Sequence, residues 1–456
     1  MQTVSIILHK EQQKKRIKIN MGFKNNLKSV YTTLVLGHFS TSLCAPLFAF
    51  LFFERSSPLL PYSTSMAERA IYFGIFLTLY KIASMLSNPF FGTLSDIIGR
   101  KKVYYIIILG MFIYGLAGII SNVFNNIWIF MIGTTIFGFL WAMNSISVAT
   151  INDVTIPSKK ATKLAFMQTF IGIGILAGPV VGGRLGSIKI LGHDYILPFI
   201  ILSLFAIVLF FFVKFTYNDT FFPKRIKKDK KKFPLKSCLV ELFSSKAILW
   251  LILVYILDQI SWGTYYDFAP SIAKTVFHLN VKEIGWFDGI IGASLIVSSG
   301  LLLPFLKKFS KDHTLMLVAS IAGLIGVSAA YISSFFPDYN ISYLILWVSI
   351  FPVVACDIII FCTLVSYFSN VISSEYQGTL IGLIYIIGMI AGAIMAPINA
   401  ILMSYKMNLP LVVCLIAMIL LIIIVLILRK RRGFDVINVQ LTLEAKKASS
   451  NLNIFE

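Results

Sequence analysis

Runs of about 20 apolar residues recur along the chain, separated by short polar segments. A helix that crosses the hydrocarbon core of a bilayer needs about 20 such residues. The pattern predicts an all-α membrane protein with twelve transmembrane helices: 29–53, 70–91, 103–121, 127–150, 164–187, 196–215, 247–269, 284–305, 314–334, 341–365, 379–404 and 408–428.

The longest interval between two spans separates the helices into six and six. The predicted domains are an N-terminal tail, a six-helix bundle, a basic linker, a second six-helix bundle and a C-terminal tail: 1–28, 29–215, 216–246, 247–428 and 429–456. The halves are weakly similar, since Gly174 and Pro179 align with Gly392 and Pro397. Two such pseudo-symmetric halves are typical of transporters built from repeats.

Composition and charge narrow the class of protein further. Hydrophobic residues make up 57% of the chain and charged residues only 13%, whereas an average soluble protein has about 25% charged residues. The formal net charge is +20, and 32 of the 40 basic residues fall on the side of the membrane that carries the two tails. The positive-inside rule therefore predicts a multi-pass protein of the cell (inner) membrane with both termini in the cytoplasm. Because the basic residues are spread over several segments, they favour contact with membrane lipid and disfavour nucleic-acid binding.

The segment after the second span carries a recognisable motif, Gly92-Thr-Leu-Ser-Asp96-Ile-Ile-Gly99-Arg100-Lys-Lys. It resembles the loop signature of the major facilitator superfamily, with Ile97 replacing one Arg. The resemblance implies the major facilitator fold. It also implies that Asp96 and Arg100 form a cytoplasmic latch with Asp153 as the acidic partner of the arginine.

The fifth span is rich in small residues at spacings that allow helices to approach closely. Its residues Gly174, Gly178, Pro179, Gly182 and Gly183 resemble the antiporter signature of drug:proton antiporters in the same superfamily. This resemblance implies export by antiport. One departure runs against standard proton antiport, because Thr134 stands where proton-coupled members often carry an Arg.

Charged side chains inside a bilayer usually mark a transport pathway, because burying them is costly. Lys81, Asp258 and Asp357 lie well inside predicted spans. We expect Lys81 to pair with one of the two carboxylates, and Asp258 or Asp357 to exchange protons during transport. Direct binding of an anionic substrate by Lys81 is the alternative. Asp267 and Asp288 lie nearer the outer ends of their spans and are expected to reach water.

Polar and aromatic residues at helical spacing extend this predicted pathway. Asp258 shares a helix face with Tyr255, Trp262 and Tyr265. The residues expected to face it from the first half are Trp141 and Asn144 in the fourth span and His38 in the first. Helix packing is the alternative role for His38 and for the aromatic residues.

The sequence lacks the motifs of several other protein classes. There is no phosphate-binding GK[ST] loop, no HExxH and no clustered Cys/His spacing, so we predict no cofactor, no metal site and no enzymatic activity. An intramembrane enzyme or a channel is a weaker interpretation. The leading hypothesis is a monomeric secondary active transporter that works by alternating access and exports a drug-like small molecule in exchange for protons. The alternative is proton symport of a metabolite such as an amino acid or organic acid.

Overall fold

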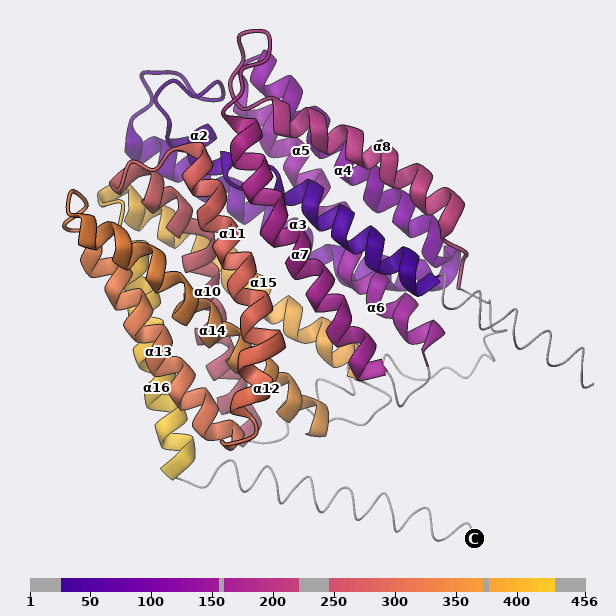
Figure 1. The fold of residues 1–456 in the computed structure, drawn as a ribbon, viewed down its shortest axis with the longest axis vertical. Helices are drawn as coiled ribbons and strands as arrows, with labels where there is room; N and C mark the ends of the chain where they lie inside the picture. The colour runs from indigo at the N-terminus through magenta and orange to yellow at the C-terminus, as the bar shows by residue number, and fades with distance from the viewer. Residues whose placement is uncertain (1–25, 156–159, 221–245, 372–376, 431–456) are drawn as a thin grey trace, which may run out of the picture.

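The computed structural model describes residues 26–155, 160–220, 246–371 and 377–430 (Figure 1). These residues form helices joined by short turns, and the described part holds no strand beyond one isolated bridge between Ile190 and His193. Internal hydrogen bonding of this kind lets a backbone cross a bilayer, where no water is available to it.

The first half begins with a helix over 26–42, which is followed by seven further helices. They are α2 (Leu47–Phe53), α3 (Met66–Ile98), α4 (Arg100–Val123), α5 (Ile127–Leu140), α6 (Met143–Val154), α7 (Lys160–Gly186) and α8 (Leu197–Thr216). The second half comprises α10 (Lys246–Val276), α11 (Val281–Val297), η2 (Ser298–Leu302), α12 (Leu303–Leu306), α13 (Asp312–Ser333), α14 (Asn340–Val371), α15 (Gln377–Tyr405) and α16 (Pro410–Lys430).

The structure confirms the predicted fold class. Eleven helical segments of the described chain are long and apolar enough to cross a membrane. The remaining span is α10, which has 31 residues but carries the polar side chains of Asp258, Gln259 and Asp267. Two spans predicted as continuous are interrupted, the first by turns at 43–46 and the fourth at 141–142. Pro46 explains the first break, since it lacks a backbone donor, whereas the apolar pattern gives no sign of the second.

The helices run between two ends of the molecule (Figure 1). We call the end that carries the segments 54–65, 187–196 and 277–280 the loop face. The opposite end, where Gly99 joins α3 to α4, is the latch face.

The two halves meet along helix pairs, with α3 packed against α15 and α7 against α11. Small residues allow this close approach. A Cβ atom added to Gly183 of α7 would lie 2.5 Å from the carbonyl oxygen of Val281, and one added to Gly285 of α11 would lie 2.5 Å from that of Pro179. The interface therefore requires glycine at both crossing positions.

Candidate functional site

A pair of buried carboxyl groups lies within the second half. Asp258 of α10 is fully buried and Asp357 of α14 is 6% exposed. The side-chain amide of Gln259 donates hydrogen bonds to both, at 3.2 Å to Asp258 Oδ2 and 3.1 Å to Asp357 Oδ1. Tyr255 lies next to this group, with its ring 6.3 Å from that of Phe361.

No lysine or arginine of the described chain forms an ion pair with either carboxyl group. Asp258 Oδ1 is buried and accepts no hydrogen bond from the residues described. Two carboxylates that share a buried site without a cation repel each other, so one proton held between them stabilises the arrangement. The pair therefore has the chemistry of a proton-binding site.

The predicted pairing of Lys81 is wrong. Lys81 of α3 binds Asp267 of α10, with 2.6 Å between Nζ and Oδ2, rather than Asp258 or Asp357. Gly392 of α15 provides room, since a Cβ atom there would lie 2.8 Å from the ammonium nitrogen. The packing of α3 against α10 decides which carboxylate the Lys81 side chain can reach. The spacing of residues within one helix does not give this information.

The expectation that Asp267 and Asp288 reach water is also wrong. The side chain of Asp267 is 12% exposed because it faces Lys81 across the boundary between the halves. Asp288 of α11 is 8% exposed. Both positions lie about two to three turns from the ends of their helices, too deep for a short carboxylate to extend to the surface.

In the first half, the structure brings together three of the predicted residues. His38 Nε2 lies 3.0 Å from Asn144 Oδ1, and the His38 ring meets that of Trp141 edge-on at 5.4 Å. Trp141 lies at the break between α5 and α6. His38 is 8% exposed, so its contacts match the packing role that was the alternative for this residue.

The aromatic residues predicted on one face of α10 separate into different surroundings. Tyr255 lies beside the carboxyl pair, as described above, whereas Trp262 is half-buried with its ring 5.5 Å from that of Tyr266. Tyr265 is completely buried in the hydrophobic core, so it does not line a pathway in this structure.

A network around Arg100 ties the start of α4 to three other helix ends at the latch face. The Arg100 guanidinium lies 2.7 Å from Asp96 Oδ1 and 3.2 Å from Asp153 Oδ2. Its backbone N–H donates to Asp219 Oδ1 at 3.1 Å, and Thr220 donates to Asp153 at 3.3 Å. The carboxylates come from the ends of α3 and α6 and from the segment after α8.

Two further contacts fix this end of the molecule. Gly99 has φ +99°, and a Cβ atom there would collide with the Asp219 carboxylate. The Tyr217 hydroxyl and the Thr150 hydroxyl are 2.9 Å apart. Burial raises the pKa of Tyr217 to about 12, so the hydroxyl would keep its proton even in alkaline solution where an exposed tyrosine begins to lose it. Gly92, the first residue of the motif, has open space around its Cβ position.

The small residues of α7 use two faces. Gly174, Gly178 and Gly182 lie against the first span, where added Cβ atoms would contact its backbone between Val35 and Leu43. Pro179 and Gly183 lie against α11 instead. One helix therefore packs closely on a neighbour within its own half and on a helix of the other half.

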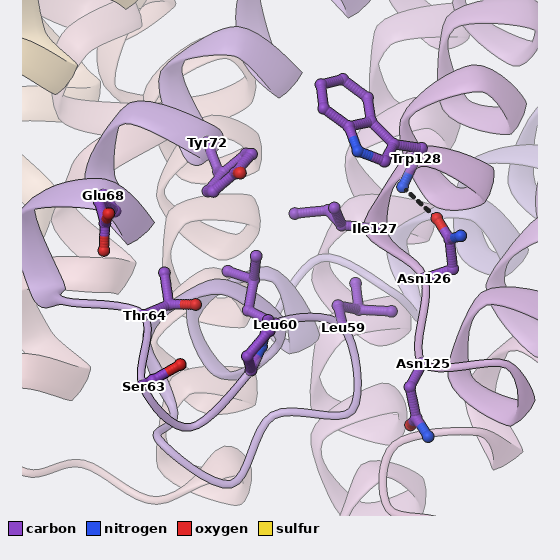
Figure 2. A pocket seen from close by; sticks show the side chains of 11 residues that line it. Leu59, Leu60, Ser63, Thr64, Glu68, Tyr72, Asn125, Asn126, Ile127 and Trp128 are labelled. Carbon is purple, nitrogen blue, oxygen red and sulfur yellow. Dashed lines mark hydrogen bonds between the residues drawn. The ribbon is translucent and has the colours of Figure 1, made fainter.

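A separate pocket opens at the loop face, between the segment before α3 and the turn from α4 to α5 (Figure 2). Its polar and aromatic lining comes from the first half alone and includes Glu68, Tyr72 and Trp128. Asn126 in its wall accepts a hydrogen bond from the backbone of Trp128 at 2.9 Å and so caps α5. None of the predicted site residues lines this pocket.

The sequence pattern of the Major Facilitator Superfamily matches residues 39–397. The chain belongs to the Major Facilitator Superfamily. It is a multi-pass member of this superfamily of membrane carriers, with eleven helical segments in its described part that are long and apolar enough to cross a bilayer.

Curated relatives include proteins named for drug resistance. The chain is 26% identical over 241 residues to the class B tetracycline resistance protein of Escherichia coli. This match covers 53% of this chain and 56% of that protein. It is 27% identical over 237 residues to the multidrug resistance protein MdtG of Escherichia coli (strain SMS-3-5 / SECEC), covering 52% and 55% of the two chains. The matches thus span little more than half the length of these relatives.

Solved structures share the fold across nearly the whole chain. A D-xylose-proton symporter has a TM-score of 0.69 at 14% identity, covering 88% of this chain and 97% of its own. The human organic anion transporter MFSD10 has a TM-score of 0.63 at 15% identity, covering 88% and 99%. At these identities the likeness shows the common superfamily fold and nothing about the substrate.

Sequence reasoning missed two residues of these networks. Gln259 bridges the two buried carboxyl groups, and its polar side chain inside a span was the available signal. Asp219 accepts a hydrogen bond from the backbone of Arg100, although it lies in the predicted basic linker 216–246, and no local pattern distinguished it.

Proposed function

We propose that this transporter exports a drug-like compound in exchange for protons, with the Asp258–Gln259–Asp357 group as its proton-binding site. The observation that carries the proposal is a buried carboxyl pair bridged by an amide and without a cationic partner in the described chain. Such a pair can take up and release a proton when the surrounding helices move. The tetracycline and multidrug resistance relatives support the class of substrate.

Several features follow from this proposal. The protein lies in the inner membrane with both termini in the cytoplasm, so the loop face points outward. The bundles 29–215 and 247–428 rock as two bodies within a monomer, in contact with membrane lipid. The Arg100 network acts as the cytoplasmic latch that favours one end of the cycle, and the glycines of α7 permit the movement against α11. Trp141 and Asn144 contribute to the substrate path from the first half, and His38 packs against both.

The symport alternative has less support in the structure. It was favoured by Thr134 in place of an Arg and by Lys81 as a ligand for an anionic substrate, and the ammonium group of Lys81 is already bound by Asp267. Release of Lys81 from that ion pair would have to accompany substrate binding, at an electrostatic cost.

Proton movement in proteoliposomes tests the proposal directly. The purified protein is reconstituted with an internal pH dye, tetracycline is added outside without a pH gradient, and the direction of proton flow is recorded. Protons that leave the lumen as tetracycline enters would establish antiport. Protons that enter with the compound would establish symport and overturn the proposed direction.

Replacing the central carboxylate tests the proposed proton site. Asp258→Asn keeps the shape of the side chain but cannot release a proton, so we expect proton-driven accumulation to be lost and substrate exchange without a gradient to remain. Asp194→Asn is the matched control, because it removes an exposed carboxylate of the 187–196 segment. If proton-driven accumulation persisted in Asp258→Asn, Asp258 would not be the coupling group.

A further inference from the structure

A charged bridge connects the two halves at the loop face. Lys274, near the end of α10, lies 2.7 Å from the carboxylate of Glu54, which directly follows α2. The lysine also donates to the carbonyl oxygen of Phe53 at 3.3 Å, and its ammonium group lies 5.3 Å from the centre of the Phe50 ring. The Lys274 side chain is 12% exposed and that of Glu54 34%, so the pair is largely shielded from water.

Next to this ion pair, aromatic side chains also join the two halves. Phe73 of α3 packs edge-on against Phe268 of α10, with ring centroids 5.4 Å apart. Phe53 packs against the same Phe73 ring at 5.4 Å. All three side chains are buried, so the helix ends of the two halves are joined here by both charge and apolar packing.

Arg69 shapes the segment that presents Glu54. Arg69 is completely buried in the first turn of α3, and in the part of the chain that the structure describes its guanidinium donates only to backbone carbonyl oxygens. The acceptors are those of Phe52 at 3.1 Å, Glu54 at 2.7 Å, Arg55 at 3.4 Å, Pro61 at 2.9 Å and Thr64 at 3.1 Å.

This arrangement uses the fork geometry that distinguishes arginine from lysine. A buried cation needs hydrogen bonds to replace its lost hydration, and here five carbonyl groups of one short segment provide them. The segment 52–64 is therefore wrapped around a single side chain. Because the Glu54 carbonyl is among the acceptors, the backbone that carries the Glu54 carboxylate is fixed relative to α3.

We propose that the Glu54–Lys274 ion pair is a gate that holds the loop face closed, and that Arg69 is its positioning residue. Arg69 has no hydrogen bond to a side chain among the described residues, and it acts by holding the Glu54 backbone within reach of α10. Opening toward the loop face must separate α10 from α2 and so break the pair. The inference goes beyond the proposed proton exchange and holds whichever side of the membrane the loop face points to.

The gate can be tested by access to a reporter cysteine beneath it. Tyr266→Cys is introduced into the full chain, eight residues before Lys274 and thus about 12 Å deeper along α10. The rate of modification by a membrane-impermeant maleimide is measured in right-side-out and inverted vesicles. The same chain without this change gives the background from the native cysteines.

We expect Glu54→Gln and Lys274→Gln each to raise the modification rate from the loop face roughly five-fold, the factor for a partly buried ion pair. Exchanging the charges, Glu54→Lys with Lys274→Glu, should return the rate toward the original value. Asp194→Asn is the control, since its ion pair with Lys189 lies within a single segment of the same face. Rates unchanged by Glu54→Gln would overturn the gate.

Two further variants test whether Arg69 acts by positioning Glu54 rather than by stabilising the fold in general. Arg69→Lys should raise the rate as Glu54→Gln does, and the double variant should be no faster than either single variant, because Arg69 acts through Glu54. Additive effects would overturn its positioning role. Glu54→Asp gives a second test, since on a fixed backbone the shorter carboxylate cannot reach Lys274 and modification should be fast, whereas a slow rate would show that the segment adjusts freely.

Comparing the two vesicle orientations keeps this test separate from the proposed function. Modification from the inverted side that still depends on Glu54 would support the gate and overturn the proposed orientation. Loss of proton coupling without a change in these rates would leave the gate standing.

Discussion

Gly99 and Gly92 belong to the same motif, yet their surroundings differ. Gly99 adopts φ +99° and ψ 152°, a region open essentially to glycine alone, and it faces the Asp219 carboxylate. Gly92 is helical and has no neighbour within 4 Å of its Cβ position. The backbone conformation at Gly99 therefore requires glycine, whereas the helical position of Gly92 does not.

Substituting the two glycines should separate these roles. Gly99→Ala should destabilise the protein by about 1–3 kcal/mol, since the backbone is strained and Asp219 is displaced from Arg100. Gly92→Ala should leave stability unchanged or slightly raised, because alanine is the better helix former. Thermal unfolding of the two variants in detergent measures the difference, and equal midpoints would contradict this account.

At the scale of elements, α7 is packed by its glycines against two neighbours at once. On one face it follows the first span, including the turns at 43–46, and on the other it crosses α11 through Gly183 and Gly285. Close backbone contact of this kind is governed by shape, so the crossing point cannot accept a side chain.

Bulk added at this crossing should disturb the pairing of the halves. Gly285→Leu should lower both the amount of folded protein and the transport rate, because the side chain would overlap Pro179 and Gly183. The control is Gly300→Leu in the same span, where the Cβ position has no neighbour within 4 Å. Fluorescence-detected size exclusion compares the two, and equal profiles would refute a tight crossing.

At the scale of the whole molecule, a largely buried ion pair between α3 and α10 connects the halves. Lys81 reaches from α3 to Asp267 of α10, and both side chains are nearly buried, at 13% and 12% exposure. Removing one partner of such a pair leaves an uncompensated charge, whereas removing both is far less costly.

A single and a double variant test whether losing one partner of this ion pair costs more stability than losing both. Asp267→Asn should destabilise the protein by roughly 2–4 kcal/mol, since the lysine ammonium loses its counter-charge. Combining it with Lys81→Met should recover most of that loss. Thermal stability of the purified variants provides the measurement, with the exposed pair of Lys189 and Asp194 as control. A double variant no more stable than Asp267→Asn would show that the ion pair does not connect the halves energetically.

The sequence by itself determined the class of the molecule. The length of an apolar run determines whether a helix can cross the bilayer, and the distribution of basic residues determines its orientation. Both are local properties of the sequence, so they predicted a membrane protein with twelve spans. The motif beginning at Gly92 identified the superfamily. Helix spacing also selected His38, Trp141 and Asn144, which the structure places in contact.

Only the tertiary structure decided which polar groups meet. Lys81 pairs with Asp267, Gln259 bridges Asp258 and Asp357, and Arg69 binds the segment beside Glu54. Periodicity gives the face of a helix on which a residue lies, but the rotation and depth of the neighbouring helix determine its partner. Those quantities arise from side-chain packing along the whole length of each helix pair, which no short stretch of sequence contains.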